Sequence, residues 1–244
     1  MIKQVPGKIY LADQRGLLET SQFRRQSTFS FETFQHEYKG PLGRLYGLNE
    51  ETLAGGHTVE FAVAADSYIV LLPITGAVAF STGGGPHGTV EAEEIVTIAA
   101  PAGTTLALRN VFADELSSFL HIWVRATKPL AVPHSATAMA TVFDGPMLEN
   151  QLRELVSARI EDHPPIEPNL PFVLSLGRFL GRHEAVYHLT LGSRLFAFII
   201  AGAFELEGRL LHEKDGLALW NVAEVELEAL SNHALVLVLE LLPD

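Results

Sequence analysis

The chain has 244 residues and a net charge of −12, from 29 acidic residues against 17 lysines and arginines. This length suits two domains, and 48% hydrophobic residues with 19% charged residues can supply each domain with a core. The acidic balance argues against direct nucleic-acid binding, and the absence of cysteine excludes disulfides, thiolate metal sites and cysteine nucleophiles.

The first residues, Met1–Lys8, lack the apolar centre of a signal peptide. No stretch of the sequence reaches the roughly 20 apolar residues that a membrane span needs. We therefore expect a cytoplasmic protein without membrane contacts.

The first half of the chain is predicted to form short strands, because β-branched and aromatic residues alternate with turns that contain Gly, Pro or Asn. The predicted strands are Thr58–Ala64, Tyr68–Leu72, Ala77–Phe80, Ile95–Ala99, Thr104–Asn110 and Phe119–Arg125. The glycine-rich run 81–88 precedes a strand instead of opening a helix, so we interpret it as a hairpin loop and not as a phosphate-binding loop.

One helix is predicted, over residues 146–160. Its apolar residues recur at helical spacing, and Asp144 stands where an N-cap residue would. The segment that follows, residues 163–171, is rich in proline and should not form regular structure.

A second set of strands is predicted after this link, at Phe172–Leu176, Ala185–Leu191, Leu195–Ile200, Phe204–Glu207, Val225–Leu230 and Leu235–Leu241. The halves resemble each other, since an apolar strand ends at Gly76 in the first and at Gly202 in the second, and another strand follows each glycine. Duplicated short strands favour a pair of β-barrels over a parallel α/β sheet. We expect an all-β fold with domains at residues 1–133 and 134–244, the second including the helix and the proline-rich link.

Two spacings in the first half match the motifs of cupin barrels, G-x5-H-x-H-x3,4-E-x6-G and G-x5-P-x-G-x2-H-x3-N. Gly56 and Gly76 bound the first motif, and Pro101, Gly103 and Asn110 stand in their places in the second. The chain further resembles pirin and the pirin-like quercetinases in the segments Asp13–Gly16, Ser27–Phe31, Gly43–Glu50, Phe119–Val124 and Asp215–Trp220. This resemblance implies two cupin (jelly-roll) barrels.

The resemblance also implies where a metal would be bound. Pirin-like proteins hold iron or a similar metal through the two His of an H-x-H pair and a later His-x-Glu. Carried onto this chain, these positions are Ala62, Ala64, Leu106 and Leu108, and the acidic slot of the first motif is Tyr68. None of the four can donate an electron pair to a metal. Because side chains alternate along a strand, we expect these five residues to form an apolar core or pocket inside the barrel, without metal or other cofactor.

Glu60 shares the predicted face of Ala62, so it is a candidate general base in the apolar pocket. The alternative is a rim residue paired with Arg44 or Arg109.

In the second half, Arg182 and Glu184 are candidates for an acid–base pair or for a salt bridge between the barrels. His188 falls on the first ligand position of the second barrel, where we interpret it as a structural histidine.

Three functions remain open. The first is a metal-free ligand-binding or regulatory protein whose partner is a small apolar or aromatic molecule or another protein. The second is a quercetinase-like dioxygenase whose metal is bound by other residues. The third is a cofactor-free enzyme that uses Glu60 or the pair Arg182 and Glu184.

Overall fold

The structure is a computed structural model that describes residues 5–130, 136–157 and 170–243. Within these ranges the chain forms strands with two short 3₁₀ turns, η1 (Ala12–Gln14) and η2 (Gly145–Leu148), and no helix that could span a membrane. The strands make two compact units. The first is residues 16–142, and the second combines residues 1–15 with 143–244.

The first barrel has a seven-stranded sheet in the order β12-β9-β6-β11-β4-β3-β2 and a four-stranded sheet in the order β5-β10-β7-β8. Its strands are β2 (Gly16–Glu19), β3 (Phe23–Ser27), β4 (Leu45–Leu53), β5 (Thr58–Ala62), β6 (Ser67–Thr75), β7 (Ala77–Thr82), β8 (His87–Glu91), β9 (Glu94–Ala100), β10 (Thr105–Asn110), β11 (Ser117–Arg125) and β12 (Thr137–Val142).

The second barrel has a six-stranded sheet in the order β1-β19-β16-β21-β14-β13 and a four-stranded sheet in the order β15-β20-β17-β18. Its strands are β1 (Gly7–Tyr10), β13 (Leu152–Val156), β14 (Phe172–Phe179), β15 (Glu184–His188), β16 (Arg194–Ala201), β17 (Ala203–Leu206), β18 (Arg209–His212), β19 (Gly216–Trp220), β20 (Glu224–Ala229) and β21 (Ala234–Leu241).

The two barrels repeat one topology. The order β5-β10-β7-β8 corresponds to β15-β20-β17-β18, and β9-β6-β11-β4-β3 corresponds to β19-β16-β21-β14-β13. Gly76 and Gly202 occupy equivalent turns with φ of +77° and +79°, a conformation that favours glycine because a Cβ atom would clash. The predicted duplication into two cupin-like barrels is confirmed.

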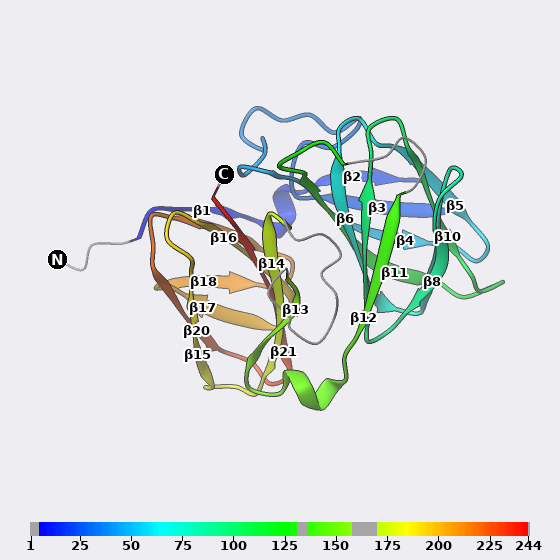
Figure 1. Ribbon diagram of the computed structural model, residues 1–244. Helices are drawn as coiled ribbons and strands as arrows, with labels where there is room; N and C mark the ends of the chain where they lie inside the picture. Colours follow the sequence, from blue (N-terminus) through cyan, green and yellow to red (C-terminus); the bar gives the residue numbers. More distant parts are fainter. Residues whose placement is uncertain (1–4, 131–135, 158–169, 244) are drawn as a thin grey trace. The chain divides into compact units, whose positions relative to one another are not determined.

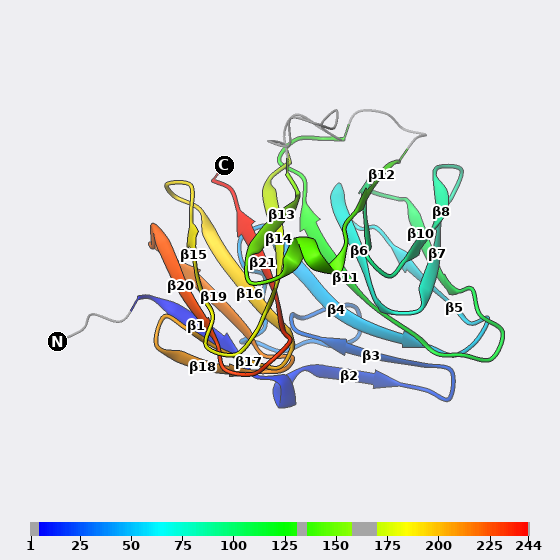
Figure 2. The same cartoon turned by 90° about the horizontal axis from the view of Figure 1, so that it is seen from below.

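The predicted first domain, residues 1–133, is wrong at both its start and its end. Strand β12 pairs with β9 of the first barrel, so that barrel continues to Val142. Strand β1 pairs with β19, so the N-terminal segment belongs to the second barrel. The blue strand β1 lies among strands coloured from yellow to red in both Figure 1 and Figure 2. The order of elements in the sequence does not show that an N-terminal strand pairs with a strand near the C-terminus.

The helix predicted over residues 146–160 is also wrong, within the part of that range that the structure describes. Asp144 does cap a turn, since its side chain accepts a hydrogen bond from the Met147 N–H at 2.9 Å, but this turn is the short η2. The chain then forms β13, which pairs with β14. A register shift between Glu154 and Val156 interrupts the alternation of the strand, so that Leu155 and Val156 are both buried. Because of this bulge two adjacent apolar residues are buried, which in the sequence looks like the spacing of apolar residues in a helix.

Asn110, the last residue of the second motif, has a structural role. The Asn110 side chain is buried and donates to the carbonyl oxygens of Leu53 (2.9 Å) and Glu115 (2.7 Å). Its Oδ1 accepts from the Phe112 N–H and from the Ser117 hydroxyl, both at 3.0 Å. Asn110 thus satisfies polar groups in the turn that joins β10 to β11 and at the end of β4, and it can do so with or without a metal.

Candidate functional site

The interior of the first barrel is lined by large apolar side chains from β5 and β10. On β5 the burial alternates, with Val59 and Phe61 inside and Thr58, Glu60 and Ala62 exposed. This alternation continues past the strand, where Val63 is buried and Ala64 is exposed. The predicted inward positions Ala62 and Ala64 are therefore wrong by one residue, because the larger apolar set of a strand faces the core.

On β10 the prediction places the side chains correctly. Leu106 and Leu108 are fully buried, and Leu106 lies opposite Phe61 in the antiparallel ladder. They pack in one hydrophobic cluster with Val59, Phe61 and Val63. With the register of β5 corrected by one residue, the positions that the resemblance assigns to metal ligands carry only hydrocarbon side chains.

Tyr68 does not face this cluster. It is buried, but it lies on β6 between Ser67 and Ile69, and Ile69 and Leu71 are the residues of that strand that join the interior cluster. By alternation Tyr68 points from the opposite face of the sheet. The predicted pocket lining is accordingly reduced to Leu106 and Leu108, with Phe61 and Val63 in place of the two alanines.

A polar stripe that the sequence analysis missed crosses the inside of the seven-stranded sheet. It consists of Arg25 on β3, Glu51 on β4 and His121 on β11, which are neighbouring strands, and Arg25 lies directly opposite Glu51 in the ladder. The Arg25 Nε atom donates to Glu51 Oε2 at 2.6 Å, and Glu51 Oε2 lies 3.2 Å from His121 Nε2. Arg25 is 5% exposed, and Glu51 and His121 are 0% exposed.

Trp123 fixes the tautomer of His121. Its Nε1–H donates to His121 Nδ1 at 2.7 Å, so Nδ1 must be the unprotonated nitrogen. The proton of the neutral ring is therefore on Nε2, from which it is donated to Glu51. Burial lowers the pKa of His121, and the neighbouring Glu51 opposes this only in part. The ring is neutral and uses both nitrogens.

The guanidinium of Arg25 is surrounded by aromatic rings. Its Cζ atom lies 4.5 Å from the ring centre of Phe61, 5.8 Å from that of Phe23 and 5.9 Å from that of Phe31. Its NH1 group also pairs with Glu32, whose side chain is 38% exposed. A cation bounded by ring faces and carboxylates is stabilised by both.

These residues do not fit a transition-metal site. A metal on His121 Nε2 would require the proton on Nδ1, where Trp123 already donates, and the bonded Glu51 oxygen is shared with Arg25. Within the described ranges, Glu51 Oε1 and the Asn49 side chain are buried polar atoms without a hydrogen-bond partner, but they are too few to form a coordination sphere. No group of three or more His, Asp or Glu able to hold a metal occurs in that same part of the chain.

The sequence contained a signal for this stripe. Phe119, His121 and Trp123 alternate with Leu120, Ile122 and Val124, so both faces of β11 are apolar and the strand must be buried on both. A histidine inside such a strand needs buried partners. The partners are far away in sequence, and no spacing within the chain points to Arg25 or Glu51.

The other predicted candidates lie on exposed surfaces. Glu60 is on the outer face of β5, away from the interior cluster. Arg182 is exposed and pairs with Glu228 at 2.9 Å. Glu184 is exposed and lies opposite Glu228 in the ladder of β15 and β20. None of the three candidates faces a barrel interior.

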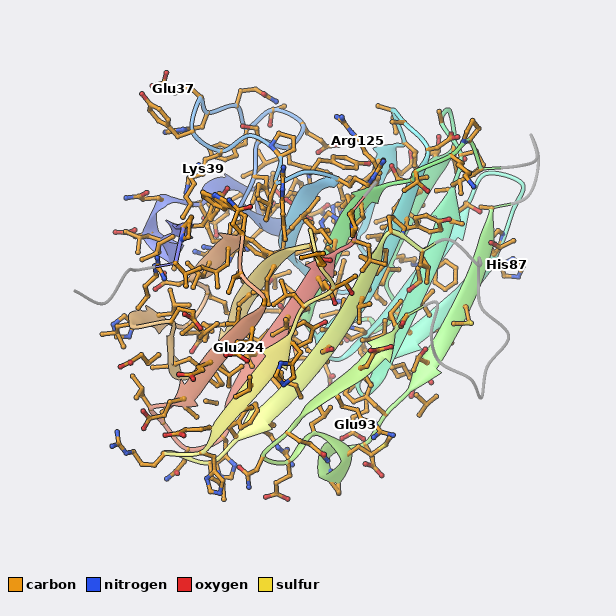
Figure 3. All side chains as sticks on the ribbon, turned by 60° about the vertical axis from the view of Figure 1, so that its left-hand side comes forward. Glu37, Lys39, His87, Glu93, Arg125 and Glu224 are labelled. Atoms are coloured by element: carbon orange, nitrogen blue, oxygen red, sulfur yellow. The ribbon has the colours of Figure 1, made fainter. Side chains whose placement is uncertain are left out.

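The outer face of the second four-stranded sheet carries a groove of about 290 Å³ with an acidic lining. Its residues are Glu184, Ala185, Val186, Glu205, Glu207, Gly208, Glu226, Leu227 and Glu228. Glu224, labelled in Figure 3, lies on the same strand as Glu226 and Glu228. The carboxylates are exposed or half-buried, so this face is a region of strong negative potential.

The interior of the second barrel has its own polar contact. His188, which the motif count places at the first ligand position and which we interpreted as a structural histidine, is exposed, and its neighbour Tyr187 packs against the core cluster. The Tyr187 hydroxyl donates to Glu240 Oε2 at 3.0 Å, and the Thr190 N–H donates to Glu240 Oε1 at 2.7 Å. Burial opposes ionisation of Glu240, but these hydrogen bonds outweigh it and lower its pKa. Burial and the nearby Glu240 raise the pKa of Tyr187. The contact joins β15 to β21.

Known proteins share this architecture. Residues 171–241 match the family model Pirin_C_2, the quercetinase C-terminal cupin domain. YhhW from Escherichia coli is 18% identical, with a TM-score of 0.85 over 98% of this chain and 99% of that one. The structure of bacterial pirin YhhW from Escherichia coli in complex with nickel(II) has a TM-score of 0.84, with 98% of this chain and 100% of that chain covered. Quercetin 2,3-dioxygenase from Acinetobacter baumannii is 15% identical, with a TM-score of 0.75 over 100% and 88%.

No curated protein sequence matches the chain. The structural similarities are at low identity, so they establish the fold, and the family model adds a sequence match in the second barrel. The chain therefore has the two-barrel fold of these pirin structures, and residues 171–241 in its second barrel match the quercetinase C-terminal cupin domain.

Proposed function

We propose that this chain is a metal-independent pirin-like protein that acts by binding a partner and not as a metal dioxygenase. The observation that carries the proposal is the donor set of the first barrel. The inward positions on β5 and β10 offer hydrocarbon atoms, and the buried imidazole of His121 is already hydrogen-bonded at both nitrogens.

A protein partner is favoured over a small apolar molecule. Leu106, Leu108, Phe61 and Val63 are packed into the core cluster, where each is 0–1% exposed. A small ligand would have to displace this packing, which costs free energy. We place this binding function in the cytoplasm and expect neither nucleic acid nor membrane as the partner.

The test is the metal content of the wild-type protein. The chain is produced without a His-tag in medium supplemented with iron, nickel, manganese and copper, and its metals are measured by mass spectrometry. We expect far less than one metal ion per chain, an unchanged Tm after treatment with a chelator, and no oxygen consumption with quercetin. E. coli pirin YhhW, known in complex with nickel(II), is the positive control. A stoichiometric metal, or chelator-sensitive turnover of quercetin, would favour the dioxygenase instead.

A further inference from the structure

The interior of the first barrel has the features of a cation site. Glu51 is a fully buried carboxylate, and the rings of Phe23, Phe31 and Phe61 lie within 6 Å of one point. A buried carboxylate is strongly unfavourable without a cation, and aromatic ring faces favour one. The group at that point is the guanidinium of Arg25.

Arg25 uses different nitrogens to bond to the two carboxylates of the site. Its Nε donates to Glu51 at 2.6 Å, and NH1 pairs with Glu32 nearer the surface. The planar guanidinium can bond to two carboxylates and still stack against Phe61, which an ammonium group cannot do as well. Because Glu51 is neutralised in this way, His121 is not required to carry a charge, and its proton is held on Nε2 by the Trp123 hydrogen bond.

We propose that Arg25 is the built-in cation of this barrel, taking the place of an ion bound from solution. The inference rests on the proposed function, since it explains how a pirin-like barrel is complete without a metal. It predicts two separate barriers to metal binding. Arg25 occupies the carboxylate, and Trp123 holds the histidine in the tautomer that has no lone pair on Nε2.

Both barriers can be removed by substitution. The introduced imidazole of Arg25→His carries its Nε2 at the same number of bonds from Cα as the arginine Nε. With Glu51 and His121 it would make a set of two histidines and one carboxylate, a known set of ligands for divalent metals. Glu51 Oε2 and His121 Nε2 are already 3.2 Å apart, close to the separation of two neighbouring ligands with bonds of about 2.1 Å.

The metal test uses cobalt(II), followed by its visible absorption and by titration calorimetry. We expect the double variant Arg25→His/Trp123→Phe to bind one Co²⁺ per chain at least about tenfold more tightly than the wild type or Trp123→Phe alone. The matched control is Arg24→His/Trp123→Phe, because Arg24 is exposed on the other face of the same strand. Binding of Co²⁺ by both double variants with equal affinity would overturn the inference, and if neither variant binds Co²⁺ the stability test decides.

The stability test works even where a histidine variant does not bind. Arg25→Met leaves Glu51 buried without a cation and is expected to lower the Tm of the first barrel by on the order of 10 °C. Arg24→Met should shift it by no more than about 2 °C. Adding Glu51→Gln removes the buried charge, so Arg25→Met/Glu51→Gln should recover at least about half of the loss.

The outcomes distinguish the two proposals. Stoichiometric metal in the wild type would sink the proposed function. A metal-free wild type in which Arg25→Met is as stable as Arg24→Met would sink only the assignment of Arg25. An Arg25→Met loss that Glu51→Gln fails to recover would also overturn that assignment, because the arginine would then act by packing and not by charge.

Discussion

Acid should weaken the first barrel through His121. The folded protein keeps this ring neutral with a pKa below 6.5, whereas the unfolded chain takes up a proton near 6.5. The unfolded state therefore binds more protons between pH 6.5 and the lowered value, so the free energy of unfolding falls as the pH falls through this window. The full effect amounts to about 1.4 kcal/mol for each pH unit of the window.

This prediction can be checked with a single fluorophore. The chain has two tryptophans, Trp123 in the first barrel and Trp220 in the second. In a Trp220→Phe background, urea unfolding followed by Trp123 fluorescence is measured at pH 7.5 and 5.5. The loss on acidification should be clearly smaller in His121→Gln, which cannot titrate. An equal loss in both proteins would show that His121 is not the group responsible.

The residue positions that the sequence predicted correctly are those on β10, and those on β5 are shifted. Counting from Gly56 along the motif selected Ala62 and Ala64, yet the pattern of side-chain size selects Val59, Phe61 and Val63. Hydrophobic alternation sets the register of a half-buried strand, and a motif count does not. The doubly apolar pattern of β11 marks His121 as buried, but its partners Arg25 and Glu51 were beyond prediction, because they depend on which strands are neighbours in the sheet.

The turns at Gly76 and Gly202 should be equally intolerant of a side chain. Both have positive φ, and an added Cβ would lie 2.8 Å from the Ser117 hydroxyl in the first turn and 2.4 Å from the Ser231 hydroxyl in the second. We expect Gly76→Ala and Gly202→Ala each to cost about 1–3 kcal/mol, measured by chemical unfolding. Gly83→Ala is the control, since an added Cβ there meets nothing within 4 Å. A neutral Gly202→Ala would contradict the equivalence of the turns.

Asp215 should anchor the N-terminal segment to the second barrel. Its Oδ1 accepts from the Ala12 N–H at 2.7 Å, and its Oδ2 accepts from the His212 N–H at 2.9 Å. Asp215→Ala leaves both donors without this partner, which should cost about 2–3 kcal/mol. Hydrogen exchange should then accelerate in β1 more than in β14. Glu213→Ala, at an exposed neighbouring side chain, should leave both rates unchanged.

At the level of elements, the sequence predicted strands well and the segment after Asp144 badly. The strands alternate regularly, and this pattern is local, whereas the pairing of strands is often between distant parts of the chain, as for β4 with β11 and β14 with β21. The segment that contains Leu155 and Val156 is a strand because β14 offers an edge to pair with. The helix was predicted only from the spacing of apolar residues within the segment, and this tertiary contact outweighs that local preference.

The whole molecule should be stabilised by salt. Its net charge is −12, and like charges face each other in the second barrel, where Glu228 lies opposite Glu184 and Glu205 on adjacent strands. Raising NaCl from about 20 mM to about 500 mM screens this repulsion and should raise Tm by a few degrees. Glu205→Lys should raise Tm at low salt and reduce the dependence on salt. A Tm that falls with salt would mean that attractive ion pairs dominate.

The pairing of β1 with β19 has a consequence for biosynthesis. Ala12 and Asp215, which join the two segments, are 203 residues apart. During translation, residues 16–142 are complete and can fold while the strand made before them still has no partner. The second barrel closes only after β21 has been synthesised, although its strand β1 leaves the ribosome before the whole of the first barrel. Such distant contacts slow folding, and the first barrel should accordingly reach its native state well before the second.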